Sequence, residues 1–512
     1  MNRMLDLLIT DLRHLVSDLG KDGGLTSPSI YDTAQVLRLA SASEGACVTL
    51  DWLLAQQQAD GGWGNPAIPL TRDVPTLATV LALSKHGNRA GSHDAALHAG
   101  LSFLERQAQQ WRAPLSDDIP SAVELLLPRL LEDAAAAGLD LDQEPYSDVI
   151  TLGRRRRQMI ARLRPLAGTA AVHSWEAWGS TPDPAVIDGS GGVGHSPAAT
   201  AAWLRVAADR PELADMRVAA ERYLAGAAAS TGIGVPGVMP NAWPIARTEQ
   251  ATALYGILLA GLIDHPTLND SIQPILTELA RALTPIGLGT SDYFVTDGDD
   301  TAMALACLAG RRKVSIEPML HFAIDSHFST YVGELQPSLS VTAHAIHVLV
   351  LLGKPAAKAS SYLRERQHTD GSWSGDKWNG SWLYTTCHTL AALLSTDQAA
   401  LLSTDQCDLT TGLTSICADQ HADGGWGLIS SSSEETAYAV MALLLLARAG
   451  KLPAEGRAAL KRAATFLEQR YRPFKEETTA VWLAKEPYRP RRVSRAFEIS
   501  ALLALAIEGF VV

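Results

Sequence analysis

One pattern occurs three times in this chain of 512 residues and constrains its fold more than any other feature. The pattern is Gln-x-x-Asp-Gly-[Gly/Ser]-Trp, and it spans residues 57–63, 367–373 and 420–426, with a degenerate copy at 188–194. Each full copy lies between two stretches with helical periodicity, so the repeating unit is helix, Asp-Gly turn, helix. Glycine supplies the turn conformations, and tryptophan offers a flat apolar surface with one donor that can pin adjacent helix ends.

Few segments of the chain have the alternating, β-branched pattern of strands, so we expect an all-α protein built from stacked helix pairs. Such pairs can close into a ring or continue as an open solenoid, and the pattern alone leaves both possibilities open. The length allows two to four domains with sizeable cores. The content of 47% hydrophobic and 19% charged residues is typical of a globular chain.

Charge and cysteine usage narrow the range of partners and locations. The net charge of −12 argues against nucleic acid as a partner, and the arginine run at 154–157 reads as a solvated or salt-bridged helix face. The five cysteines include no CxxC pair, which fits a reducing cytoplasm and argues against structural zinc. The first twenty residues combine acidic and basic residues with regularly spaced leucines, which predicts an amphipathic helix rather than a signal peptide or a transmembrane segment.

Three carboxylates lie close together in residues 296–302, Thr-Asp-Gly-Asp-Asp-Thr-Ala: Asp297, Asp299 and Asp300. Because three like charges this close cannot all ionise easily, one carboxyl tends to keep its proton near neutral pH. An alanine-rich helical run follows from Thr301, and its N-terminus favours the negative charge left after proton transfer. Such an acid can protonate a weak base, such as an alkene.

A calcium loop or a simple helix cap would also use aspartates here. An EF-hand needs a glutamate at its twelfth position, and that position, counted from Asp297, is the apolar Leu308. A cap needs only one acid. The cluster therefore indicates acid chemistry more than either alternative.

Together these features resemble the class II terpene cyclases, the family whose reactions begin with protonation. The repeats resemble its QW motifs, and residues 297–302 resemble its DxDD-T-A motif. Further segments resemble copalyl diphosphate synthases of the diterpene branch, in order along the chain: 29–34 (SIYDTA), 120–131 (PSAVELLLPRLL), 172–174 (VHS), 195–201 (HSPAATA), 240–242 (PNA), 481–485 (VWLAK) and 488–495. Val172 and Ala242 depart from the Leu and Val of the LHS and PNV motifs of that branch.

The resemblance implies a double α/α-barrel with the active site between two domains, named γ and β in this family. Residues 1–19 would form an N-terminal helix that packs with the β domain, residues 20–228 the γ domain, and residues 229–512 the β domain with the acidic motif. The chain contains no DDxxD motif of the kind that ionises a diphosphate. We therefore expect the product to retain its diphosphate.

The resemblance also implies catalytic roles. Asp299 would be the general acid, with Asp297 and Asp300 orienting it and tuning its acidity. It would protonate the terminal alkene of an isoprenoid diphosphate, and the alkenes would then close two six-membered rings. His173 and Asn241, at the LHS and PNV positions, would hold the water that removes the final proton.

The diphosphate end of the substrate needs cations. Mg²⁺ retains several waters and binds through one or two carboxylates plus phosphate oxygens. By resemblance, Glu124 is the candidate Mg²⁺ ligand. Lys377, its neighbour Trp378, and Lys485 are candidate substrate contacts.

We expect an enzyme that converts geranylgeranyl diphosphate to copalyl diphosphate of the ent series, in the cytoplasm. The product would pass to a class I terpene synthase or another downstream enzyme. An alternative is a farnesyl diphosphate cyclase that makes a drimenyl-type diphosphate. A triterpene cyclase fits less well, because it would have more of the tryptophan repeats and an apolar membrane-docking segment, and would not need the diphosphate-site segments. A protein prenyltransferase subunit would need Asp, Cys and His zinc ligands, which cannot be assembled from this sequence. A non-catalytic helical-barrel binding protein would not need the intact acidic motif.

Overall fold

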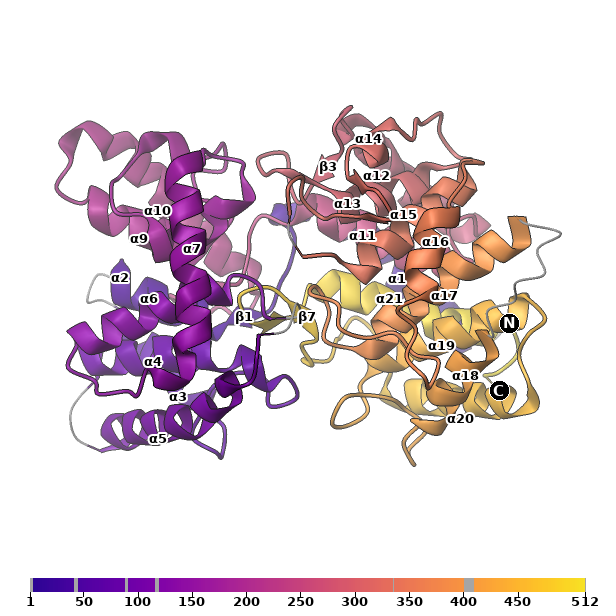
Figure 1. Cartoon of the computed structure of the whole chain (residues 1–512). Helices are drawn as coiled ribbons and strands as arrows, with labels where there is room; N and C mark the ends of the chain where they lie inside the picture. The colour runs from indigo at the N-terminus through magenta and orange to yellow at the C-terminus, as the bar shows by residue number, and fades with distance from the viewer. Residues whose placement is uncertain are drawn as a thin grey trace.

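The computed structural model describes residues 3–40, 45–87, 91–115, 119–334, 336–399 and 409–511. Two helical lobes lie side by side, with the first half of the chain mostly in one lobe and the second half in the other (Figure 1). The described strands are two-residue antiparallel pairs: β1 (Pro28–Ser29) with β2 (Met239–Pro240), β3 (Leu288–Gly289) with β4 (Thr296–Asp297), β5 (Ala323–Ile324) with β6 (His327–Phe328), and β7 (Trp482–Leu483) with β8 (Pro487–Tyr488). The all-α prediction is confirmed.

The lobe formed by the second half of the chain, called the β lobe below, is a closed barrel of helix pairs. Its inner helices pack each on the next, and the last packs on the first: α11 (Ala246–Leu259), α13 (Gly298–Leu308), α15 (Leu339–Leu351), α17 (Trp382–Ala399), α19 (Ser433–Arg448) and α21 (Arg491–Ile507). Around them lie α12 (Asn269–Ala282), α14 (Glu317–Leu320), α16 (Ala357–Arg364), α18 (Leu409–Ala418) and α20 (Ala454–Arg470). This lobe is therefore a ring and not an open solenoid.

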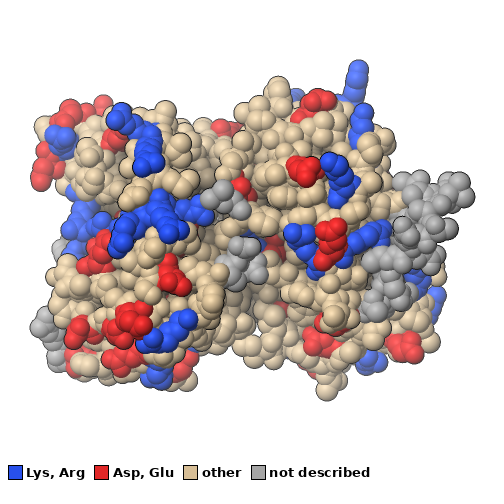
Figure 2. All heavy atoms as spheres, in the orientation of Figure 1, with Lys and Arg blue, Asp and Glu red and all other residues tan. Residues whose placement is uncertain are grey.

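The other lobe, called the γ lobe below, also closes on itself. Its inner ring is α2 (Ile30–Leu39), α4 (Asp73–His86), α6 (Val123–Ala136), α8 (Trp175–Trp178) and α9 (Pro197–Ala207), and α9 packs back on α2. Outside lie α3 (Ala46–Ala55), α5 (Ser92–Gln107), α7 (Ser147–Leu163) and α10 (Ala214–Ser230). Basic side chains gather over α7 in the space-filling view (Figure 2), where Arg157 forms an ion pair with Glu132 at 2.8 Å.

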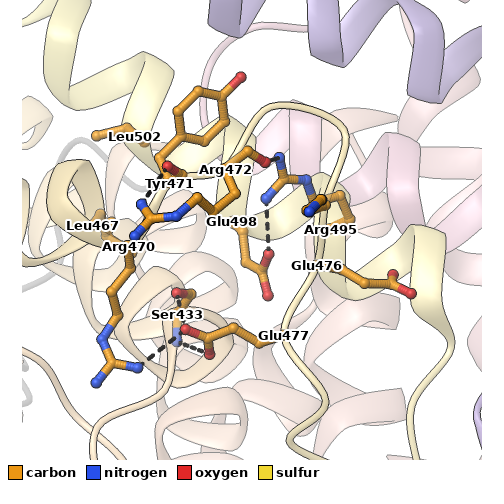
Figure 3. Close-up of a pocket in the computed structure, with 11 residues that line it drawn as sticks. Ser433, Leu467, Arg470, Tyr471, Arg472, Glu476, Glu477, Arg495, Glu498 and Leu502 are labelled. Carbon is orange, nitrogen blue, oxygen red and sulfur yellow. Dashed lines mark hydrogen bonds and ion pairs between the residues drawn. The ribbon is translucent and has the colours of Figure 1, made fainter.

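The N-terminal helix α1 (Arg3–Asp18) completes the outer layer of the β lobe by packing on α21 and α12. Leu8, Leu12 and Val16 are buried in the core of that lobe. On its polar side, Asp11 accepts a hydrogen bond from Arg495 at 2.5 Å. A pocket of about 150 Å³ lies beside this junction, and several of its charged side chains pair with one another (Figure 3).

The three tryptophan repeats share one geometry. The indole N–H of Trp63, Trp373 and Trp426 donates in each case to a carbonyl oxygen ten residues earlier, at 2.7, 2.8 and 2.7 Å. Each of these carbonyls lies near the end of the preceding helix, so the ring pins that helix end to the turn. All three side chains are fully buried, which confirms the structural role expected from the repeat.

The two lobes have separate hydrophobic cores. The buried clusters of the γ lobe include residues up to Met239. The core of the β lobe consists of buried residues from α1 and of residues from Ala251 onward. The changeover between the two cores therefore lies between Met239 and Ala251. No helix in the described ranges is long and apolar enough to cross a lipid bilayer.

Candidate active site

The acidic motif at residues 297–300, called the acidic loop below, lies where β4 runs directly into α13, at one end of the β-lobe barrel. Asp297 is the N-cap of α13, and its side chain accepts the backbone N–H of Asp300 at 2.7 Å. This cap starts the helix at Gly298, three residues earlier than the sequence pattern indicated. Asp299 and Asp300 consequently lie in its first turn, where the helix dipole stabilises negative charge.

Close packing under the loop explains its glycine. A Cβ atom at Gly298 would lie 2.4 Å from the carbonyl oxygen of Ser329, so only glycine lets the two backbones approach. The Gly298 N–H donates to the Thr330 carbonyl at 2.8 Å, and the Thr330 hydroxyl accepts from the Trp378 indole at 2.9 Å. Trp378 is thus fixed beside the acidic loop.

The three aspartates differ in environment. Asp297 and Asp300 are each only 3% exposed, whereas the Asp299 side chain retains 15% of its exposure. Burial, reinforced by the Asp300 carboxyl, raises the pKa of Asp297 well above its usual value. Burial also raises the pKa of Asp300 to about 7, against the opposing effect of the Thr248 hydroxyl, which donates to it at 2.5 Å. Asp297 and Asp300 are thus buried, whereas Asp299 between them stays partly accessible.

A chain of two histidines continues from Asp299 into the barrel. His344 Nδ1 on α15 lies 2.5 Å from Asp299 Oδ1. On the other side of the same ring, His344 Nε2 is in hydrogen-bond contact with Nδ1 of His388 on α17. His388 is fully buried, and its Nε2 has no hydrogen-bond partner in the part of the chain that the structure describes. Burial and the neighbouring His344 lower the pKa of His388 well below its usual value, so this ring is neutral.

Aromatic rings surround these histidines. Ring centroids of Tyr255 and His344 are 4.9 Å apart, and those of Tyr384 and His388 are 4.1 Å apart. Tyr438 and Phe497 extend this cluster within the barrel. Ring faces of this kind can stabilise positive charge in a desolvated site.

A buried ion cluster joins the two lobes beside the acid site. Lys485, only 2% exposed, donates to Glu176 of α8 at 2.6 Å and to the Ser196 hydroxyl at 2.5 Å. Its Nζ also lies 4.0 Å from Asp32 Oδ1. Burial raises the pKa of Asp32 to about 7. The segments 29–34, 195–201 and 481–485, which sequence linked only by resemblance, meet in this cluster.

His173 lies on the γ side of the same region. Its Nδ1 is 2.7 Å from the Gly194 carbonyl oxygen, which can only accept, so the ring proton is on Nδ1. Burial, with Lys485 nearby, lowers the pKa of His173 to about 3. The ring is therefore neutral with an unprotonated Nε2, the form that can accept a hydrogen bond from water.

Asn241 lies next to β2 and is fully buried. Its amide nitrogen donates to the Glu486 carbonyl at 2.9 Å, while its side-chain oxygen has no hydrogen-bond partner within the described ranges. Asn241 thus bonds to Glu486, the neighbour of Lys485, and His173 lies within electrostatic range of Lys485. No hydrogen bond among those described joins His173 to Asn241 directly.

The remaining predicted contacts are occupied by protein partners. Lys377 is 2.5 Å from Glu334 and also donates to the Gln336 carbonyl at 2.8 Å. Burial lowers the pKa of Lys377, although Glu334 opposes the shift. Lys485 is bound in the interdomain cluster, so neither ammonium group is free in this structure.

Glu124 lies in the first turn of α6, away from the acidic loop in sequence and on the other lobe. Its nearest cation is Arg156, with 4.0 Å between Arg156 Nε and Glu124 Oε1. Burial raises the pKa of Glu124. Across the described part of the chain, no group of three or more His, Cys, Asp or Glu side chains is arranged to hold a metal ion. A single carboxylate fits Mg²⁺ held mainly by water and phosphate oxygens, and does not fit an all-protein site.

A cavity of about 670 Å³ lies between α7 and α8 of the γ lobe. Arg154, Arg157 and Arg164 line it together with Trp175 and Trp178, and none of the acidic-loop residues does. Its wall α8 also carries Glu176 of the interdomain cluster.

Sequence reasoning missed His344, Glu176 and Thr248 as parts of the site. Each is a single residue on a helix distant in sequence from its partner, so no local motif marks it. The fold alone brings them within hydrogen-bond distance of the acidic loop or of Lys485.

Comparisons with known proteins agree with this arrangement. Residues 332–469 match the family model of the squalene-hopene cyclase C-terminal domain. The chain is 45% identical to (+)-kolavenyl diphosphate synthase of Herpetosiphon aurantiacus, over 99% of both chains. It is 32% identical to ent-copalyl diphosphate synthase of a Streptomyces species, over 94% of this chain and 93% of that one.

The structural comparison extends over both barrels. The solved structure of ent-copalyl diphosphate synthase from Streptomyces platensis matches with a TM-score of 0.80 at 28% identity, over 97% of this chain and 99% of that one. The double α/α-barrel prediction is confirmed. Because the sequence similarity extends over nearly the whole chain and the acidic motif is intact, the chain belongs to the class II diterpene cyclases, enzymes that form bicyclic products by protonation-initiated cyclisation.

Proposed function

We propose that this enzyme cyclises geranylgeranyl diphosphate to a bicyclic diterpenyl diphosphate and that Asp299 supplies the initiating proton. The observation that carries the proposal is the asymmetry of the acidic loop: two buried aspartates flank the partly exposed Asp299. At neutral pH Asp297 keeps its proton, and Asp300, with its pKa raised to about 7, keeps one about half of the time, which limits negative charge around Asp299.

Initiation follows from this geometry. Asp299 gives its proton to the terminal alkene and forms a tertiary cation on the substrate. The α13 N-terminus and the His344 ring then stabilise the aspartate left behind. Successive alkenes attack the cation and close two rings, while Tyr255, Tyr384 and Trp378 provide ring faces near the acid.

Termination requires a base for one proton of the bicyclic cation. The unprotonated Nε2 of His173 and the unpartnered oxygen of Asn241 are acceptors that can hold a water between the lobes. A carbocation is acidic enough that such a positioned water removes the proton. One proton enters and one leaves, so the reaction is an isomerisation that retains the diphosphate.

Mg²⁺ would neutralise charge on the diphosphate, and Glu124 is the residue that would hold it, together with phosphate oxygens and water. Among the described residues, its recorded ion-pair partner is Arg156 at 4.0 Å, a long separation that leaves the carboxylate available for this role. A retained diphosphate would in turn be the group on which a downstream class I terpene synthase acts.

Two products have specific support. The 45% identity to a (+)-kolavenyl diphosphate synthase favours a kolavenyl-type product. The His173 and Asn241 acceptors, with the 32% identity to an ent-copalyl diphosphate synthase, favour direct proton loss to copalyl diphosphate of the ent series. Kolavenyl diphosphate is the better supported of the two, because the identity is higher and spans the whole chain.

The test is incubation with geranylgeranyl diphosphate and Mg²⁺, dephosphorylation, and chiral gas chromatography with mass spectrometry against kolavenol and copalol standards. In D2O the product should carry one added deuterium at the protonated end. Preference for farnesyl diphosphate would instead indicate a drimenyl-type cyclase. Absence of turnover with either substrate would favour a binding protein.

A further inference from the structure

His388 lies behind His344, on the side of that ring away from Asp299. One ring nitrogen contacts His344, and the other is buried without a hydrogen-bond partner among the described residues. A buried histidine with one orphaned nitrogen is costly, because the polar atom loses water and gains nothing. An unpaired polar atom of this kind next to catalytic residues suggests that His388 has a functional role.

The proton positions along the chain follow from chemistry. A neutral imidazole has one N–H donor and one acceptor. A buried N–H without an acceptor is the rarer defect, so the His388 proton belongs on Nδ1, which faces His344, and not on the orphaned Nε2. His344 Nε2 must then accept, and the His344 proton is on Nδ1, where it donates to Asp299 Oδ1.

The opposite direction of donation would disable the acid. Asp299 would then give its own proton to His344 Nδ1, and that proton would not be available to an alkene. His344 alone can adopt either tautomer. A fixed donor behind it removes the unproductive one.

We propose that His388 is a positioning residue for initiation: by donating to His344 it fixes the tautomer in which His344 donates to Oδ1 of Asp299, so that Oδ2 carries the proton for the substrate. After transfer, the same His344 N–H stabilises the aspartate, and no proton needs to move within the histidine pair. The proposal rests on Asp299 as the general acid of the proposed function.

Two substitutions separate this role from packing. His388→Leu keeps an apolar side chain of moderate size and removes the donor. His388→Asn keeps a donor, because its amide nitrogen lies roughly where the imidazole Nδ1 does. His347→Leu is the matched control. This histidine lies one helical turn from His344 on α15, and its Nδ1 is 2.8 Å from the Tyr255 hydroxyl. It takes no part in the hydrogen-bond chain from Asp299 through His344 to His388.

The readout is kcat as a function of pH, with folding checked by circular dichroism. Because Asp299 acts only while it carries its proton, kcat should fall toward alkaline pH. The hydrogen bond from His344 favours the ionised carboxylate, so its loss in His388→Leu should move the alkaline limb of the profile to higher pH. We expect kcat to fall by about 10- to 100-fold, the range known for groups that orient metal-bound histidines, with little change in KM.

The other groups that face Asp299 are common to all variants and cancel in the comparison: Asp297, Asp300, Asp376, Lys377, Tyr255, Tyr384 and Tyr488. His388→Asn should keep the wild-type limb and most of the rate, and His347→Leu should keep the limb. An unchanged limb in folded His388→Leu would overturn the proposal, as would equal damage by the Asn variant. If Asp299→Asn itself kept its activity, the proposed function would fail instead.

Discussion

Lys485 of the β lobe and Glu176 of the γ lobe form a buried ion pair, with 2.6 Å between Nζ and Oε1. Asp32 and Ser196 complete the cluster, so residues from four distant segments fix how the two barrels meet. Because Asn241 donates to the carbonyl of Glu486, the neighbour of Lys485, the cluster also fixes the surroundings of that candidate site residue. This observation gives Lys485 an interface role that the sequence motif did not reveal.

Lys485→Met should strongly destabilise the protein. Removing the ammonium leaves Glu176 as an uncompensated buried charge, which typically costs about 3–5 kcal/mol in the free energy of unfolding. Chemical denaturation measures the loss, and the Lys485→Met/Glu176→Gln double variant should recover part of it. A Lys485→Met protein of normal stability with a raised KM would identify Lys485 as a phosphate contact instead.

Asp32 predicts a specific pH dependence of stability. Burial raises its pKa from 3.8 to about 7, so the folded state holds a proton that the unfolded state has already lost. This group stabilises the fold fully at acidic pH, and its contribution decreases by about 1.4 kcal/mol per pH unit as pH rises toward 7 and then levels off. In Asp32→Asn that slope should be absent. Parallel stability curves of wild type and variant from acidic to neutral pH would contradict the assignment.

His173→Ala and Asn241→Ala should alter the products more than the rate. Asp299 still protonates the alkene and the rings still close, but the cation lacks its positioned water. We expect hydroxylated or rearranged bicycles, with substrate loss within about tenfold of wild type and not the 10²–10⁴-fold loss typical of a missing general acid. Product analysis by mass spectrometry tests this. A wild-type product from both variants would exclude the pair as the base.

Glu124→Gln should raise the Mg²⁺ concentration needed for half-maximal rate by about tenfold or more while leaving the product unchanged. The amide is a weaker ligand of similar shape. Glu132→Gln on the same helix is the matched control, because Glu132 is half-exposed and pairs only with Arg157 among the described contacts. Identical Mg²⁺ dependence in both variants would remove Glu124 from the metal site.

The tryptophan repeats and the acidic loop were predictable from sequence because each is local. Indole donors pin helix ends ten residues away, and Asp297 caps its own helix. Whether the helix pairs close into rings was not predictable, since closure depends on contacts such as α21 with α11. His344 was likewise invisible, because a lone histidine on a helix gains its meaning only from Asp299 across the barrel.

Turnover by Asp299→Asn tests the central claim most directly. Asparagine has nearly the same shape but cannot donate a carboxylic proton, and Asp292→Asn, at an exposed ion pair with Arg247, is the control. With geranylgeranyl diphosphate and Mg²⁺, we expect Asp299→Asn to stay folded and to lose cyclisation by at least about 10²–10⁴-fold, while Asp292→Asn remains active. Near-normal formation of the bicyclic product by folded Asp299→Asn would contradict the account.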